Sequence, residues 1–296
     1  MKFKMSRVLR ENLIGYSFIM IWIIGFLVFV LYPFLSSIVY GLSNVRILGT
    51  GIDVDFHWFT NYRNIFQIEE GFEFTEALVD FLKDLAFQVP IIIVFSVLIA
   101  VLLNQPIKGR GIFRSIFFLP VIIASGPVIN ELVSQGAGGA NIFESYGFIA
   151  VIESTLNPAL AEPIVNIFSE IIIIFWFSGV QILIFLAGLQ KVDGQIYEAA
   201  RVDGAGPWES FWKITLPSLS NLVFVNIIYT VVLLSTFSEN PVIVSIRSNM
   251  SSTREGSGYG MATAMAWVYF LVIMIILGLI AFVFIPKEYK VRGKKK

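Results

Sequence analysis

Cysteine is absent from this chain of 296 residues, and histidine occurs once, at His57. These absences exclude disulfides, thiol redox chemistry, iron–sulfur clusters and zinc sites built from Cys and His. His57 lies in the polar stretch 53–61, which we interpret as a solvated loop. No Gly-x-x-x-x-Gly-Lys-Ser/Thr sequence is present, and the glycines at 256–260 follow no predicted strand. The chain itself is therefore not expected to bind ATP or any other cofactor.

Charge is also scarce. Only 14% of the residues are charged, whereas 56% are hydrophobic and the mean hydropathy is +0.79. Soluble domains carry about 25% charged residues, so much of this surface must face lipid. We predict an all-α integral membrane protein, one domain over residues 1–296, with about six transmembrane helices of the length that crosses a bilayer. The predicted spans are roughly 16–40, 85–103, 116–133, 171–189, 219–237 and 261–285.

Lysine and arginine gather in segments that this six-span arrangement puts on one side. The segments are 2–10, 108–114, 191–213 and 287–296, whereas the first loop on the other side is acidic. Basic residues favour the cytoplasmic side, so both termini are predicted to be cytoplasmic. The first apolar stretch is about 24 residues long and ends without an Ala-x-Ala site, so we predict a retained helix rather than a signal peptide.

The predicted cytoplasmic loop 190–217 contains the signals of two short helices joined by a turn. Residues 195–202 are mostly good helix formers, and Gly204 can adopt the left-handed conformation that ends a helix. Gly206 and Pro207 suit the start of a second helix, with Trp208 near its beginning. Such a pair of helices can dock into a groove on a partner protein. The alternative is an interfacial hairpin whose aromatic side chains rest on lipid headgroups.

This loop resembles the EAA loop of binding-protein-dependent ABC importer permeases of the maltose-type carbohydrate subfamily. The residues that carry the resemblance are Glu198, Ala199, Ala200, Asp203, Gly204, Ala205, Phe211, Ile214, Leu216 and Pro217. Weaker matches occur at Tyr32-Pro33, at Asn61-Tyr62 and over 109–120. The chain departs from the family pattern at Lys83-Asp84 and in the segment from Glu239 to Ser257, which we interpret as a serine-rich loop from Ser245 onward.

The resemblance implies a type I ABC importer transmembrane fold, in a multi-pass protein of the prokaryotic cell membrane. It implies that the loop forms coupling helices that dock on a separate ATPase, where ATP and Mg would bind. Glu198 would then meet a basic residue of that ATPase, and Gly204 would permit the turn between the helices. The implied partners are a second, similar permease, two ATPase subunits and an extracytoplasmic solute-binding protein. No nucleic-acid partner is expected.

No charged residue lies near the middle of a predicted span; Glu131 lies close to the end of the third. Ion-coupled carriers usually keep a charged group at the midplane, so this pattern favours a neutral solute and energy delivered through the loop. Sugars need aromatic rings beside amides and hydroxyls. Candidate solute-pathway residues are Trp176, Phe177, Gln181, Asn226, Thr230, Leu234 and Phe237.

Alternatives to these assignments remain open at this stage. The polar residues among the pathway candidates can equally link neighbouring helices. A self-sufficient secondary carrier and an intramembrane enzyme are the alternative functions. The first lacks a midplane charge, and the second lacks nucleophiles, metal ligands or paired carboxylates in the spans.

Overall fold

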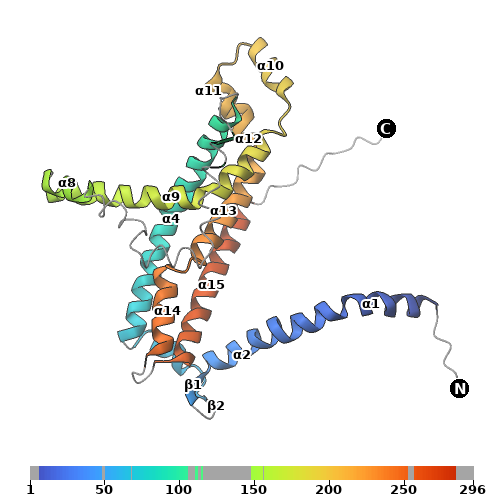
Figure 1. Cartoon of the computed structure of the whole chain (residues 1–296), viewed down its shortest axis with the longest axis vertical. Coiled ribbons are helices and arrows are strands. Elements are labelled where there is room, and N and C mark those ends of the chain that lie inside the picture. Colours follow the sequence, from blue (N-terminus) through green and yellow to red (C-terminus); the bar gives the residue numbers. More distant parts are fainter. Residues whose placement is uncertain are drawn as a thin grey trace. The chain divides into compact units, whose positions relative to one another are not determined.

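The computed structural model describes residues 7–48, 51–67, 69–105, 111–112, 115, 148–155, 157–252 and 257–284. Most of these residues are helical (Figure 1). The chain divides into two compact units, of which the first comprises 1–78 with 241–271 and the second 79–240 with 272–296. The long helices α4 (Glu69–Asn104) and α15 (Tyr259–Phe284) each contribute residues to both units.

Three helical segments are long and apolar enough to cross a membrane, namely Gly15–Gly41, Gly71–Asn104 and Tyr259–Phe284. The number rises to five if two bent pairs each count as one span. These pairs are Ile174–Leu189 with Gly194–Val202, bent by 68°, and Pro207–Ser218 with Ser220–Ser235, bent by 65°. The predicted third span, 116–133, lies outside the described residues. The structure therefore confirms a multi-pass helical protein without fixing the number of spans at six.

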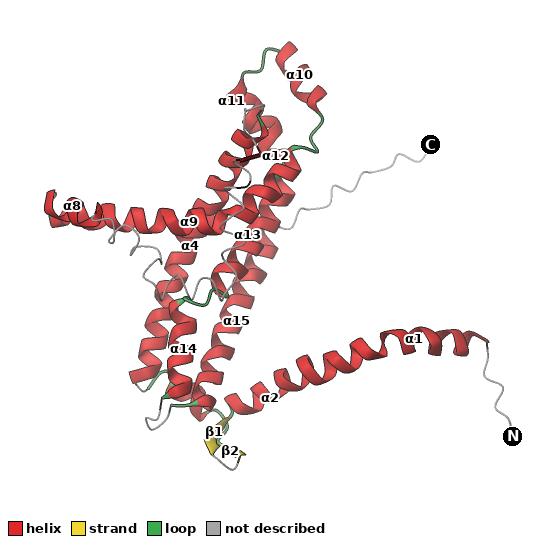
Figure 2. Ribbon diagram, viewed as in Figure 1, coloured by secondary structure: helices red, strands yellow, loops and turns green. Residues whose placement is uncertain are grey.

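The first unit begins with α1 (Arg7–Phe26), a π-helical turn (Leu27–Leu31) and α2 (Tyr32–Gly41). Pro33 lies directly after the π-helical turn in a helix that continues from α1, and because it has no N–H it cannot make the regular helical hydrogen bond at this point. The antiparallel strands β1 (Ser43–Leu48) and β2 (Gly51–Phe56) follow directly, as Figure 2 shows. The short helix α3 (Thr60–Asn64) comes next.

The hairpin corrects the prediction that 53–61 is an irregular loop in an all-helical chain. Polar side chains suggested a loop, but Ile52, Val54 and Phe56 alternate with Asp53 and Asp55. Alternation with period two is the pattern of a strand that is apolar on one face. The pairing places Val45 opposite Val54 and Ser43 opposite Phe56.

Two further segments are more helical than the sequence indicated. Helix α4 begins at Glu69, well before the predicted start at residue 85, because Phe74, Leu78 and Phe81 recur at helical spacing and are buried. The predicted serine-rich loop is helical as far as Ser251, in α14 (Pro241–Ser251), which begins with a proline at its first position.

The Asn61 side chain links the end of α2 to the start of β1. Its side-chain amide donates to the Gly41 carbonyl at 3.0 Å and to the Ser43 carbonyl at 2.9 Å. Gly260 at the start of α15 lies so close that an added Cβ would be 2.1 Å from the Ser43 oxygen. Trp267 Nε1 donates to Ser37 Oγ at 3.2 Å, which ties α15 to α2. The Asn61 amide thus satisfies one carbonyl that α2 leaves free at its end and one carbonyl of β1.

The second unit contains α8 (Phe148–Thr155), α9 (Pro158–Leu189) and α13 (Ser220–Ser235). The short elements between α9 and α13 are α10 (Gly194–Val202), α11 (Pro207–Ser210), the π-helical turn η2 (Phe211–Thr215) and α12 (Leu216–Ser218). The buried apolar side chains of this unit come largely from α4 and α9. They include Ile92, Ala100, Ile182, Phe185 and Leu186, and Leu219 just after α12 adds to them.

Candidate functional site

The loop between α9 and α13 folds into the two predicted helical arms. Asp193 caps the first arm, α10, and its carboxylate accepts from the Gln195 N–H at 3.0 Å. The arm ends at Gly204, whose φ of +85° is the left-handed conformation expected there. The Ala205 N–H closes the turn on the Ala200 carbonyl at 2.9 Å. The glycine is needed because a side chain disfavours that backbone conformation.

The second arm begins as predicted but does not continue as one regular helix. Gly206 has an extended conformation (φ −74°, ψ 169°), and Pro207 is the first residue of α11. The π-helical turn η2 then interrupts the arm. It gathers three aromatic rings: the Trp208 centroid lies 6.4 Å from that of Phe211 and 5.6 Å from that of Trp212. Trp212, which the sequence analysis did not single out, is half exposed.

A side-chain contact that the sequence did not reveal joins the two arms. Tyr197 Oη of α10 lies 3.0 Å from Thr215 Oγ1 at the end of η2. The Thr215 hydroxyl also lies 3.4 Å from the Ser210 carbonyl, to which it donates. Because a π-helical turn displaces the regular hydrogen bonds of an α-helix, such a hydroxyl supplies a partner there. The contact fixes α10 against the base of the second arm.

The residues predicted for partner contact are divided between exposed and half-buried positions. Glu198, Ala199, Asp203, Gly204 and Pro217 are exposed. Ala200, Ala205, Phe211, Ile214 and Leu216 are half-buried. The loop therefore offers carboxylates and small side chains on its surface, above a more apolar interior. Trp208 adds a ring that is 74% exposed.

Helices α9 and α13, which flank the loop, are joined by a polar contact inside the unit. Gln181 Nε2 donates to Thr230 Oγ1 at 2.8 Å, and the Thr230 hydroxyl donates to the Asn226 carbonyl at 2.7 Å. Gln181, Thr230 and Asn226 are all 0% exposed. Gly188 lies close to the Leu222 side chain, where an added Cβ would meet Leu222 Cδ1 at 2.1 Å. Small residues allow this close approach.

The remaining pathway candidates surround that polar contact. The Phe177 and Phe237 rings meet edge to face with their centroids 5.1 Å apart, and Leu234 is buried. Trp176 is half-buried, and its Nε1 has no hydrogen-bond partner among the described residues. The same holds for Gln181 Oε1 and for both side-chain polar atoms of Asn226. The structure thus gives Gln181 and Thr230 a role in helix packing and leaves Asn226 with unused hydrogen-bonding capacity.

Metal chemistry finds no support in the part of the chain that the structure describes. There, no group of three or more His, Cys, Asp or Glu side chains is placed to hold a metal ion.

Known proteins are similar to this chain in sequence and in fold. Residues 72–287 match the family of binding-protein-dependent transport system inner membrane components. The probable ABC transporter permease protein YesP of Bacillus subtilis is 30% identical over 99% of this chain and 96% of its own length. The lactose transport system permease protein LacF of Rhizobium radiobacter is 30% identical over 72% of this chain and 70% of its own.

A solved structure supports the fold. A chain of a bacterial ABC transporter that imports the acidic polysaccharide alginate superposes with a TM-score of 0.59 at 20% identity, covering 93% of this chain and 96% of that one. The fold and the loop together define a multi-pass membrane transport component. The chain belongs to the family of binding-protein-dependent transport system inner membrane components, and it is a transmembrane permease subunit of an ABC importer.

Proposed function

We propose that this permease carries a neutral, carbohydrate-like solute. Relatives at 27–30% identity are named for the transport of lactose, of multiple sugars and of arabinooligosaccharides. Segments 171–189 and 219–237 contain no Asp, Glu, Lys or Arg. An uncharged lining with aromatic rings and amides suits the hydroxyls and C–H faces of a sugar better than it suits an ion.

The chain works, in this proposal, as a single domain of six spans beside a second permease, with two ATPase subunits on the cytoplasmic side. An extracytoplasmic binding protein delivers the solute. Both termini lie in the cytoplasm of a prokaryote, which the distribution of Lys and Arg supports. The complex of a binding protein with the alginate transporter, whose chain shares this fold, also supports the arrangement.

In this proposal the movement of the ATPase subunits acts on the loop 190–217. The single observation that supports this role is the two-armed structure of the loop. Closure of the ATPases around ATP moves α10 and the second arm, which are held together by Tyr197 and Thr215. The flanking helices α9 and α13 follow because Gln181 and Thr230 join them. As the transporter changes conformation, the unpaired amide of Asn226 becomes available to solute hydroxyls.

Two serine substitutions test the coupling role, because Gly204 and Gly206 are both exposed but differ in backbone conformation. A Cβ at either position meets no atom within 4 Å, but Gly204 alone of the two has a positive φ. Gly204→Ser forces a side chain into the left-handed region at a cost of about 1–2 kcal/mol. Gly206→Ser places a favoured residue at a helix N-cap.

We expect Gly204→Ser to lower ATPase copurification and ATP-dependent sugar uptake in proteoliposomes about tenfold, which is the factor that 1.4 kcal/mol represents. Gly206→Ser should leave both unchanged. Equal, wild-type values for the two variants would remove the coupling role from this loop. The transported sugar is identified beforehand by a thermal-shift screen of the binding protein.

A further inference from the structure

Strand β2 of the hairpin is amphipathic, and its apolar side chains are exposed, whereas Val45, which pairs with Val54 on the same face, is buried. Successive side chains of a strand point to opposite faces, so Ile52, Val54 and Phe56 share one face of β2 while Asp53 and Asp55 share the other. The three apolar side chains are 58%, 41% and 47% exposed. Exposed contiguous apolar surface marks a contact with another molecule or with a membrane.

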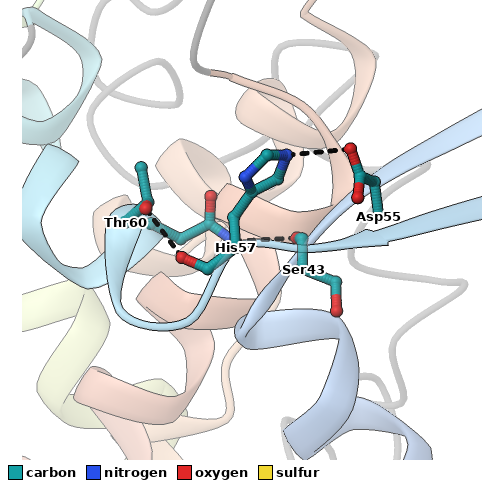
Figure 3. Close-up of polar contacts among 5 residues, drawn as sticks. Ser43, Asp55, His57 and Thr60 are labelled. Carbon is teal, nitrogen blue, oxygen red and sulfur yellow. Dashed lines mark hydrogen bonds and ion pairs between the residues drawn. The ribbon is translucent and has the colours of Figure 1, made fainter.

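The turn after β2 enlarges this apolar face. Trp58 and Phe59 are each 66% exposed, and the Trp58 ring meets the Phe56 ring edge to face at 5.0 Å. We call the set Ile52, Val54, Phe56, Trp58 and Phe59 the aromatic face. On the opposite side, His57 Nε2 lies 3.1 Å from the Asp55 carboxylate, as Figure 3 shows. The hairpin therefore carries the aromatic face on one side and the carboxylates of Asp53 and Asp55 on the other.

Trp58 has a backbone conformation that a tryptophan rarely adopts. Its φ is +55°, whereas the next residue, Phe59, has φ −86° and ψ 14°. In a tight turn with this sequence of angles the first central position favours glycine. The Thr60 hydroxyl closes the turn by donating to the His57 carbonyl at 2.7 Å (Figure 3). The His57 N–H donates to the Leu42 carbonyl at 3.0 Å.

The strain at Trp58 is not offset by burial, because two-thirds of the residue is exposed. Backbone strain of this kind persists at positions with a function. Within the chain the Trp58 ring contacts the Phe56 ring, and the rest of its exposed surface can gain free energy from a molecule outside the chain. The position of the hairpin indicates what that is.

The hairpin is fixed to the end of a membrane span. The span Gly15–Gly41 ends two residues before Ser43, where β1 begins. Asn61, which directly follows the turn, donates to the carbonyls of Gly41 and Ser43. The end of a span lies at the depth of the lipid headgroups, where tryptophan and other amphipathic rings concentrate.

We propose that the aromatic face is a membrane anchor that lies in the headgroup layer at the end of α2, with Asp53, Asp55 and His57 directed to water. The anchor fixes the depth of the first span. The proposal applies whichever side of the membrane the hairpin occupies, and it does not depend on the solute or on coupling to an ATPase.

The absence of cysteine makes this proposal directly testable. Single-cysteine variants of the full chain carry a nitroxide label, without native thiols to remove. Val54→Cys and Phe56→Cys report on the aromatic face, and Asp53→Cys and Asp55→Cys are the matched controls on the same strand. Each is reconstituted into nanodiscs of phosphatidylcholine and phosphatidylglycerol, and collisions with oxygen and with a water-soluble nickel chelate are measured.

We expect labels at 54 and 56 to collide severalfold more with oxygen, which partitions into lipid, and labels at 53 and 55 to collide more with the nickel chelate. Ile52→Cys repeats the test at a third apolar position if either apolar variant fails to reconstitute. Equal access of the nickel chelate to all labels would overturn the proposal. Shielding of 54 and 56 from both reagents would also overturn it, because it would mean that protein covers the face.

Discussion

Two buried asparagines, one in each unit, use their amides in opposite ways. Asn61 is 8% exposed, and its side-chain nitrogen donates to two backbone carbonyls. Asn226 is 0% exposed, yet neither of its side-chain polar atoms has a partner among the described residues. Buried polar groups are nearly always paired, so an unpaired amide calls for an explanation. The difference separates a residue that stabilises the fold from one whose side-chain amide has no hydrogen-bond partner among the described residues.

The packing and the hydrogen bonds around the two asparagines also differ. Around Asn61 the backbone is packed so closely that a Cβ on Gly260 would lie 3.1 Å from the Asn61 nitrogen and 2.1 Å from the Ser43 oxygen. Next to Asn226, the Thr230 hydroxyl donates to the Asn226 carbonyl and accepts from the Gln181 amide, and the Asn226 side chain makes no hydrogen bond to a described residue. The first site is therefore a structural joint, whereas the second retains unused donors and acceptors within a span.

The strongest test of the joint is Gly260→Ala. The added methyl overlaps a backbone oxygen that cannot move aside, so we expect a loss of about 3 kcal/mol, the upper part of the range for overpacked sites. Thermal unfolding of the purified chain in detergent, followed by tryptophan fluorescence, measures the loss. Gly278→Ala is the matched control in the same helix, because a Cβ there meets nothing within 4 Å. Equal stability of the two variants would show that the contact at Ser43 is loose.

Leucine substitutions compare the two asparagines directly. Asn61→Leu removes two hydrogen bonds and leaves two carbonyls without this donor, which we expect to cost about 2 kcal/mol at about 1 kcal/mol per bond. Asn226→Leu removes no bond, so the stability should change little, while sugar uptake should fall if the amide meets solute. Unfolding and uptake are measured on both variants. A stability loss at Asn226 as large as that at Asn61 would make Asn226 a structural residue as well.

The smallest expected effect concerns the contact between α9 and α13. Gln181→Leu, Thr230→Val and the double variant form a cycle that isolates the Gln181–Thr230 bond. Side-chain hydrogen bonds between membrane helices average about 0.6 kcal/mol, and we expect a coupling energy of that size from unfolding measurements. A coupling of zero would mean that packing at Gly188 and Leu222 alone joins the helices.

Local signals predicted much of the fold. The predicted apolar stretches 16–40, 219–237 and 261–285 lie within a few residues of helical segments, and Gly204 and Pro207 marked the two arms of the loop. Composition misled in two places. Acidic residues from Glu69 hid the early start of α4, and serines hid α14, because polar residues are also common on the exposed faces of helices.

The candidate site was predicted in part. The pathway residues on α9 and α13 do lie together, since spacing along a helix fixes which residues share a face. Tyr197 and Thr215 gave no signal, because their contact joins residues that are 18 positions apart. The π-helical turn at Phe211–Thr215 was also missed, and it is what brings the Trp212 ring against Trp208 and Phe211.

The sequence by itself determined that this chain enters a membrane and that its loop 190–217 has two arms, because hydropathy and backbone preference are local properties. Only the tertiary structure decided which buried amide is paired and which is not. It also decided that a strained tryptophan stands beside the end of a span. Both depend on atoms brought together from distant parts of the chain, and no local pattern of residues specifies such distances.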